Sequence, residues 1–197
     1  MSQTPQHRLI GAVLAGGASR RFGSNKALAP VPGGTLGARS VQALRDAGVD
    51  PVVAVGGIDS HLLHIPVIPD RKPDLGPLGG IASVLVWAKT GHVLVLPCDL
   101  PLVVGAHLGG FVDWVADADP SRAAVATVVG SPQPIVAAWP ASFGPLLARE
   151  VAAGRRRLFE VLDLVDWDPI DVPAELLADA DTSADLERLL GADPNNQ

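Results

Sequence analysis

The residues with the clearest chemical potential form one short stretch near the start of the chain, which reads LAGGASRRFGSNKAL and follows directly on an apolar run. Gly16 and Gly17 have no side chain, so the backbone there can turn sharply and approach a ligand closely. Their N–H groups can help to form a concavity that binds an anion. Arg20, Arg21 and Lys26 could then neutralise a polyphosphate, the arginines with a forked guanidinium and the lysine as a point charge.

The local pattern by itself does not decide between a phosphate-binding loop and a solvated basic loop at the end of a strand. The chain lacks G-x-x-x-x-G-K-[ST], and no G-x-G-x-x-G follows the first apolar run. Two familiar phosphate-binding motifs are therefore missing, and both interpretations stay open at this point.

Two aspartates are candidates for holding a metal ion. Asp99 ends the most apolar run of the chain, HVLVLPCD. A carboxylate at such a place suits Mg²⁺, which prefers oxygen ligands and often shares them with substrate phosphates. The alternative for Asp99 is a turn or cap residue. Asp181 either supplies a second metal ligand, faces a second substrate or caps an exposed helix, and Cys98 is expected to be a small buried hydrophobe.

Apolar runs that read as strands alternate with stretches that read as helices, which predicts a three-layer α/β/α, Rossmann-like fold with a mostly parallel, partly mixed sheet. We expect one domain over residues 1–197, frayed at about 1–7 and 192–197. The expected strands are 9–15, 51–57, 64–70, 92–99, a hairpin of 122–130 and 134–140 joined by SPQ, and a late strand over 165–173. The expected helices are 36–48, 76–89, 110–116, 142–154, 157–165 and 182–191, the last capped by Thr182 or Ser183.

Ligands of an open α/β sheet bind beyond the carboxyl ends of its strands. The residues that follow the predicted strands are Gly16 to Lys26, Gly56 and Gly57, Asp70, and Asp99. The sequence therefore predicts that these positions meet at one edge of the sheet.

Composition narrows the class of protein. A formal net charge of −6 is a poor match for a nonspecific nucleic-acid binder, which must neutralise phosphates. No apolar run is long enough to span a membrane. A single cysteine excludes a disulfide framework and favours a reducing cytoplasm. Residues 8–18 faintly resemble a signal peptide, but a buried first strand explains them better.

The opening stretch as a whole resembles the signature of the nucleotidyltransferase superfamily that includes molybdenum cofactor guanylyltransferases, L-A-G-G-x-S-x-R-M-G-x-D-K. Phe22 stands where the signature has methionine, and Asn25 where it has an aspartate that could orient the lysine as a charge partner. The positions that match in register are Leu14, Ala15, Gly16, Gly17, Ser19, Arg21, Gly23 and Lys26.

Three later stretches extend this resemblance over nearly the full chain. DLGPLGGI is similar to the family's G-P-L-A-G segment, with Gly79 replacing alanine. VLPCDLP is similar to its C-D-x-P strand end. DADTSADL resembles the closing N-x-N-T-P-E-D-L, with Asp179 and Asp181 in place of asparagines.

The resemblance implies a nucleotide-diphospho-sugar transferase-like fold and transfer of GMP from GTP to the phosphate of molybdenum-bearing molybdopterin, with release of pyrophosphate. GTP is favoured over CTP because LAGG and PCDLP look like the guanylyl branch. It implies Arg21, Lys26 and Asp99 as catalytic residues, and Mg²⁺, or alternatively Mn²⁺, on Asp99. The implied nucleotide contacts are Leu14, Ala15, Gly16, Gly17, Ser19, Arg20, Arg21, Gly23, Lys26, Gly56, Asp70, Gly76, Pro77, Leu78 and Asp99.

Other functions stay open. The acceptor could be a sugar phosphate or phospholactate, or the nucleotide CTP. A nucleotide-binding partner protein with weak catalysis is another class, favoured by Asn25 and by Gly56, where related enzymes often have an asparagine that meets the base. GRRRL at 154–158 is either a contact for a second phosphorylated substrate or a solvated run. We expect a monomer or weak homo-oligomer and leave open a contact with molybdoenzyme-maturation proteins.

Overall fold

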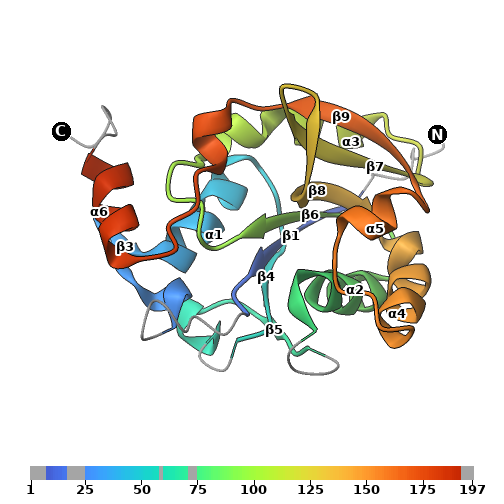
Figure 1. Ribbon diagram of the computed structural model, residues 1–197, viewed down its shortest axis with the longest axis horizontal. Coiled ribbons are helices and arrows are strands. Elements are labelled where there is room, and N and C mark those ends of the chain that lie inside the picture. Colours follow the sequence, from blue (N-terminus) through green and yellow to red (C-terminus); the bar gives the residue numbers. More distant parts are fainter. Residues whose placement is uncertain (1–7, 17–24, 58–59, 71–74, 192–197) are drawn as a thin grey trace, which may run out of the picture.

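A computed structural model describes residues 8–16, 25–57, 60–70 and 75–191. One seven-stranded sheet forms its centre, in the order β5-β4-β1-β6-β8-β7-β9 (Figure 1). Among the described strands of this sheet, β8 alone runs against its neighbours, so the predicted mostly parallel, partly mixed sheet is confirmed. The strands are β1 (Leu9–Leu14), β4 (Val52–Val55), β5 (Val67–Ile68), β6 (His92–Pro97), β7 (Arg122–Val128), β8 (Ser131–Pro140) and β9 (Asp166–Asp171), and β2 (Pro30–Val31) pairs with β3 (Gly34–Thr35) in a small hairpin.

The central strands are apolar on both faces because helices cover both sides. Successive side chains of a strand point to opposite faces. In β6, Val93 and Val95 pack into one apolar core while Leu94 and Leu96 pack into the other. This explains why the predicted strands read as near-continuous apolar runs instead of alternating ones.

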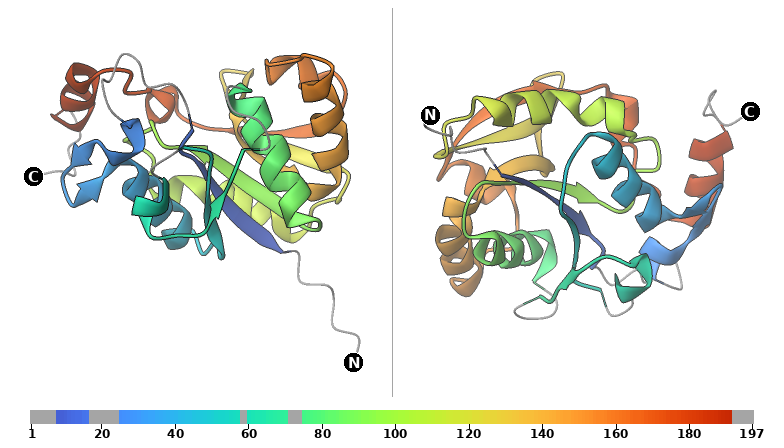
Figure 2. Two further views of the ribbon diagram at one scale, coloured as in Figure 1. Left: turned by 90° about the horizontal axis from the view of Figure 1, so that it is seen from below. Right: turned by 180° about the vertical axis from the view of Figure 1, so that it is seen from behind.

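The sheet separates two layers of helices, as the views in Figure 2 show. One layer holds α1 (Leu36–Asp46) and α3 (Gly109–Ala116), whose buried side chains include Leu44 and Phe111. The other holds α2 (Gly76–Ala88), α4 (Gly144–Ala152) and α5 (Phe159–Leu162). Short 3₁₀ helices η1 (Lys26–Leu28), η2 (Ser60–Leu63), η3 (Gly105–Leu108), η4 (Ala141–Phe143) and η5 (Ala174–Leu177) connect these elements.

The last helix, α6 (Ser183–Gly191), packs beside the β2-β3 hairpin although the two are far apart in the sequence (Figures 1 and 2). It begins at the predicted cap Thr182, whose hydroxyl accepts from the Asp185 amide while the Asp185 carboxylate accepts from the Thr182 amide. This reciprocal pair is a capping box. A small third core joins α6 to the start of the chain: Ala29, Leu36, Ala180, Leu186, Leu189 and Leu190.

Three predicted elements differ from the structure by more than a small shift of their ends. SPQ belongs to β8 and is not the connection of the hairpin; the turn is made by Val129 and Gly130, both with positive φ. The predicted strand 64–70 is a pair of residues, since the prolines on either side of Val67–Ile68 have no N–H for a sheet partner. The predicted helix 157–165 is only the short α5, because the chain then turns with bonds of 3₁₀ spacing. No helix in the described part of the chain is long and apolar enough to cross a bilayer.

Candidate active site

The residues that follow the parallel strands meet at one edge of the sheet, as the sequence predicts. β1, β4, β5 and β6 run in the same direction, so their carboxyl ends lie together. The backbones after β1 and β4 come very close: a β-carbon on Gly16 would lie 3.3 Å from the Gly56 Cα. The side chains of Leu14, at the end of β1, and of Ala15, directly after it, are buried.

The centre of this edge is an ammonium held by two carboxylates. Lys26 Nζ lies 3.0 Å from Asp99 Oδ2 and 2.9 Å from Asp181 Oδ1, and only 13% of the Lys26 side chain is exposed. Burial lowers the pKa of Lys26, but the hydrogen bond to Asp181 and the charge of Asp99 outweigh it, so this pKa is raised above its ordinary value. Lys26 is therefore a full positive charge at neutral pH.

The carboxylates reach Lys26 because the C-terminal segment is pinned to the end of β6. The Ala180 amide donates to the Asp99 carbonyl at 2.9 Å, and the Ala180 side chain is fully buried in the third core. Asp179 and Asp181, on either side of Ala180, are exposed. The family's closing motif has asparagine at both positions, so the two aspartates of this chain add two negative charges beside Asp99.

Asp99, Asp179 and Asp181 form a donor set that suits a divalent cation. One oxygen from each carboxylate lies within 4.8 Å of the others. Hard ions such as Mg²⁺ and Mn²⁺ take oxygen ligands of this kind, so these three residues fit such an ion. The sequence predicts Asp99 as a ligand and leaves Asp181 open as a second one, whereas Asp179 was not predicted. The D-x-D spacing was the available signal, since residues two apart in an extended segment share a face.

Another carboxylate, that of Asp70, lies beyond β5 and is surrounded by Gly16, Gly56 and Gly80. Its Oδ1 is buried and has no hydrogen-bond partner among the described residues. Burial raises the pKa of Asp70 above its usual range. Because a buried acceptor without a donor costs free energy, this atom is suited to a donor supplied by a ligand.

Gly56 explains how Asp70 fits there. Its φ is +66°, and a β-carbon on it would lie 2.5 Å from Asp70 Oδ2. An asparagine at this position would be strained and would collide with the carboxylate. In this chain, position 56 therefore offers main-chain groups only, and Asp70 occupies the space that a larger side chain would take.

The amino end of α2 faces the same edge. Leu75 caps the helix without a side-chain hydrogen bond among the described residues, and Gly76 begins it with a φ of +66°. Pro77, in the first turn, has no N–H, and Leu78 is buried. Main-chain N–H groups of this turn therefore lack a side-chain acceptor within the described part of the chain. A β-carbon on Gly79 would lie 2.3 Å from that of Leu75, which explains the glycine where the family signature has alanine.

Asn25 has a different contact from the one that the signature's aspartate suggests. Its Oδ1 accepts from the Ala27 amide at 3.1 Å and so caps η1. The charge partners of Lys26 come from Asp99 and Asp181 instead. Asn25 thus fixes the short helix that carries the lysine.

Some predicted site residues lie outside the described part of the chain: Gly17, Ser19, Arg20, Arg21 and Gly23.

Cys98 is buried as predicted, and burial together with the nearby Asp99 raises its thiol pKa to about 12. The thiol is therefore protonated at neutral pH and is not a nucleophile.

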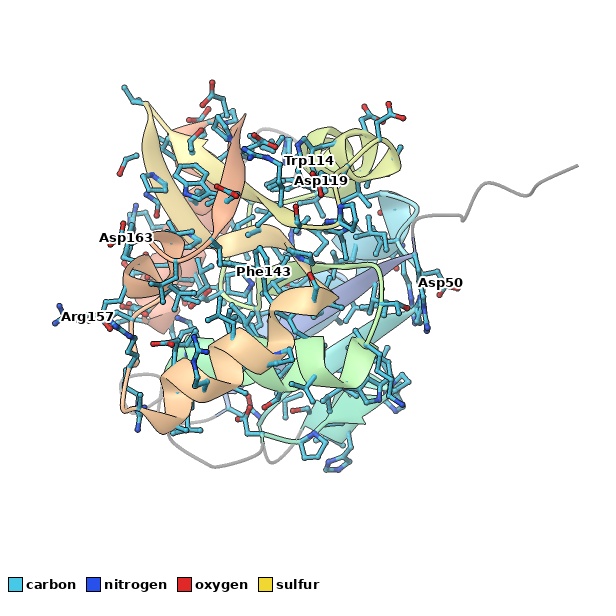
Figure 3. The ribbon with its side chains drawn as sticks, turned by 90° about the vertical axis from the view of Figure 1, so that its right-hand side faces the viewer. Asp50, Trp114, Asp119, Phe143, Arg157 and Asp163 are labelled. Atoms are coloured by element: carbon cyan, nitrogen blue, oxygen red, sulfur yellow. The ribbon has the colours of Figure 1, made fainter. Side chains whose placement is uncertain are left out.

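The arginines of GRRRL occupy the turn between α4 and α5. Arg155 pairs with Glu150 at 2.7 Å, and Arg156 donates to the carbonyls of Val151 and Arg155. Arg157 is exposed and points outward from the molecule (Figure 3). These contacts agree with the interpretation of a solvated run.

Comparison with known proteins places the chain in a family. The model of the MobA-like NTP transferase domain matches residues 11–167. A probable molybdenum cofactor guanylyltransferase of Chloroflexus aggregans is 31% identical over 93% of this chain and 94% of its own length. A molybdenum cofactor guanylyltransferase of Xanthomonas euvesicatoria is 44% identical, over 54% of either chain.

Solved structures share the fold. Rv0371c of Mycobacterium tuberculosis superposes with a TM-score of 0.70 at 22% identity, covering 96% of this chain and 100% of its own. The molybdopterin-guanine dinucleotide biosynthesis protein A of Archaeoglobus fulgidus gives 0.69 at 22% identity, covering 91% and 96%. The match of the family model and the likeness to the Chloroflexus relative show that the chain belongs to the family of MobA-like NTP transferases.

Proposed function

We propose that this protein transfers GMP from GTP to the phosphate of molybdenum-bearing molybdopterin and releases pyrophosphate. The observation that carries the proposal is the placement of Lys26, Asp99 and Asp181 in one cluster beside the carboxyl ends of β1 and β6. The names of the relatives from Chloroflexus and Xanthomonas support the choice of nucleotide and acceptor.

Asp99, Asp179 and Asp181 would hold Mg²⁺ or Mn²⁺. A related fold, Rv0371c of Mycobacterium tuberculosis, has been solved as a complex with manganese at 22% identity and a TM-score of 0.66. When bound, the cation would neutralise negative charge on the triphosphate. Lys26, with Arg21 on the strength of the signature, would hold the β- and γ-phosphates by charge-assisted hydrogen bonds.

Asp70 would bind the nucleoside. Its unpartnered Oδ1 can accept from an N–H or O–H group of the base or ribose, which would repay the cost of its burial. The main chain at Gly16 and Gly56 leaves a close approach open on the same side. The first turn of α2 would offer its N–H groups to the same ligand.

In this reaction the protein has to align the two substrates and need not form a covalent bond to either. An oxygen of the acceptor phosphate attacks the α-phosphorus of GTP, the new phosphoanhydride bond forms and the bond to the β-phosphate oxygen breaks, so that pyrophosphate leaves. Two anions that repel each other must be held in line, and the growing negative charge must be stabilised. We assign the second task to Lys26, whose ammonium lies beside Asp99 and Asp181.

A pyrophosphate-release assay with each of the four NTPs tests the proposal. Acceptors should include molybdenum-bearing molybdopterin and a simple sugar phosphate, at saturating Mg²⁺. We expect release only with GTP and the molybdopterin. Release with CTP or with the sugar phosphate would contradict the assigned substrates, and GTP binding without any release would favour a nucleotide-binding partner protein.

The proposal extends to the compartment, the domain organisation and the oligomeric state of the protein. The single buried cysteine and the lack of a membrane-spanning helix in the described residues are compatible with work in the cytoplasm. We further propose that residues 1–197 act as one domain, as a monomer or weak homo-oligomer, with small phosphorylated molecules as its ligands.

A further inference from the structure

The ammonium of Lys26 binds two of the three carboxylates that a divalent cation would use. Its distances are 3.0 Å to Asp99 Oδ2 and 2.9 Å to Asp181 Oδ1. Both carboxylates also belong to the group that can present three oxygens within 4.8 Å of one another. Lysine and cation therefore draw on one set of negative charges.

The Lys26 ammonium and a divalent cation compete for these carboxylates. Mg²⁺ binds oxygen at about 2.0–2.1 Å in a strict octahedral arrangement. An ammonium that already hydrogen-bonds two of the three carboxylates would lie close to such an ion, and their like charges would repel. Repulsion between the two positive charges therefore opposes entry of the cation while Lys26 keeps both of its carboxylate contacts.

We propose that Lys26 is an internal counter-ion that occupies the cation site until nucleotide binds. The phosphates of the nucleotide then draw Lys26 away from Asp99 and Asp181, and the vacated carboxylates accept the divalent cation. This inference rests on the proposed function, because it takes Asp99, Asp179 and Asp181 as the cation ligands. It adds that cation affinity is suppressed in the empty protein and that nucleotide relieves the suppression, a reciprocal coupling.

The local structure suits such an exchange. Asn25 caps η1 and fixes the main chain of Lys26, while the four-carbon side chain can change rotamer without moving the helix. Asp99 is held independently, since its carbonyl accepts from the Ala180 amide. The main chain that carries these carboxylates is therefore held by a contact that does not involve the ammonium.

The proposal is tested by measuring Mn²⁺ binding to the nucleotide-free protein. Electron paramagnetic resonance of the free ion monitors the binding. We expect Lys26→Met to lower the Kd for Mn²⁺ on the order of tenfold, because it removes a positive charge from the site while keeping the length of the side chain. Arg45→Met is the matched control: it makes the same change of charge at the exposed carboxyl end of α1 and should leave the Kd unchanged.

Two further variants make the result unambiguous. Lys26→Gln should also tighten Mn²⁺ binding, and it serves if Lys26→Met is poorly folded. Asp99→Asn in the Lys26→Met background should abolish the gain, which assigns the ion to this site. Unchanged or weaker Mn²⁺ binding by both folded Lys26 variants would overturn the proposal.

The titration needs neither nucleotide nor acceptor, so its outcome is separable from that of the pyrophosphate-release screen. Tighter Mn²⁺ binding by the Lys26 variants, together with no transferase activity of the unaltered protein, would contradict the proposed function alone. Normal transferase activity of the unaltered protein with no effect of the Lys26 variants on Mn²⁺ binding would contradict the exchange alone.

Discussion

Asp99 combines a functional and a structural contact in one residue. Its carboxylate binds the Lys26 ammonium and its carbonyl accepts from the Ala180 amide. Asp99→Asn keeps the shape and the main-chain bond but removes the charge, so we expect turnover to fall by about 10²–10³-fold, or roughly 3–4 kcal/mol in the transition state.

Steady-state pyrophosphate release at saturating Mg²⁺ measures this loss, and a thermal melt should show a much smaller change in stability. Asp113→Asn is the control, since Asp113 is exposed on α3 in the layer of helices that covers one face of the sheet. Near-normal turnover of Asp99→Asn would remove this carboxylate from the mechanism.

The buried carboxylate of Asp70 lowers the stability of the fold, although the proposed nucleotide binding needs it. Its folded pKa is raised by burial, so the charged form destabilises the fold at pH values above that pKa, and the cost disappears as the pH falls through it. We expect Asp70→Asn to stabilise the protein at neutral pH by about 1 kcal/mol, or roughly 2–4 °C in Tm, and to weaken nucleotide binding.

Melting curves over a series of pH values check the sign of the Asp70 effect. The difference in Tm between the variant and the unaltered protein should shrink as the pH is lowered. A variant that is less stable at neutral pH would show that the carboxylate has a donor in the folded protein.

At the scale of single elements, η1 places the lysine, and its cap can be tested. Asn25→Ala removes the oxygen that accepts from the Ala27 amide and should lower the free energy of unfolding by about 0.5–1 kcal/mol. Asn25→Asp keeps an acceptor at the same place and should retain the stability, as measured by urea unfolding. If both substitutions cost the same, the amide group and not its oxygen is needed.

The Asn25 result also bears on the family signature. An aspartate at this position was expected to orient Lys26, yet the structure gives that task to Asp99 and Asp181. Asn25→Asp should therefore change turnover little at saturating Mg²⁺, and pyrophosphate release checks it. A uniform loss of turnover would show that a neutral residue is required beside the lysine.

At the scale of the whole molecule, the site depends on the docking of α6. The third core holds Ala180 in place and is separate from the two cores that flank the sheet. Leu189→Ala should loosen this packing, with a cost of about 2–4 kcal/mol that falls mainly on the C-terminal segment. We expect turnover to fall strongly while the main melting transition moves little.

Leu147→Ala provides the contrast for the α6 prediction. Leu147 is a fully buried residue of α4, a helix that packs against α2, and it belongs to a different apolar core from the residues of α6. This variant should lower the Tm while the folded molecules keep their turnover. Equal effects of both variants on Tm and turnover would mean that the molecule unfolds as one unit, α6 included.

The sequence by itself determined the fold class and the edge where the site lies. Strands buried on both faces must be apolar at nearly every position, and that pattern is local, so β1, β4 and β6 could be predicted from composition and spacing. Parallel strands place their carboxyl ends together, so Gly16, Gly56, Asp70 and Asp99 could be expected at one edge without coordinates.

Only the tertiary structure decided which groups touch. Lys26 and Asp181 are 155 positions apart, and their contact depends on one main-chain bond at Asp99 and on the packing of α6. No periodicity encodes such a meeting, because it follows from a few distant residues fitting together. For the same reason the signature suggested only that an aspartate at position 25 could orient Lys26, whereas in the fold the Asn25 Oδ1 accepts from the Ala27 amide.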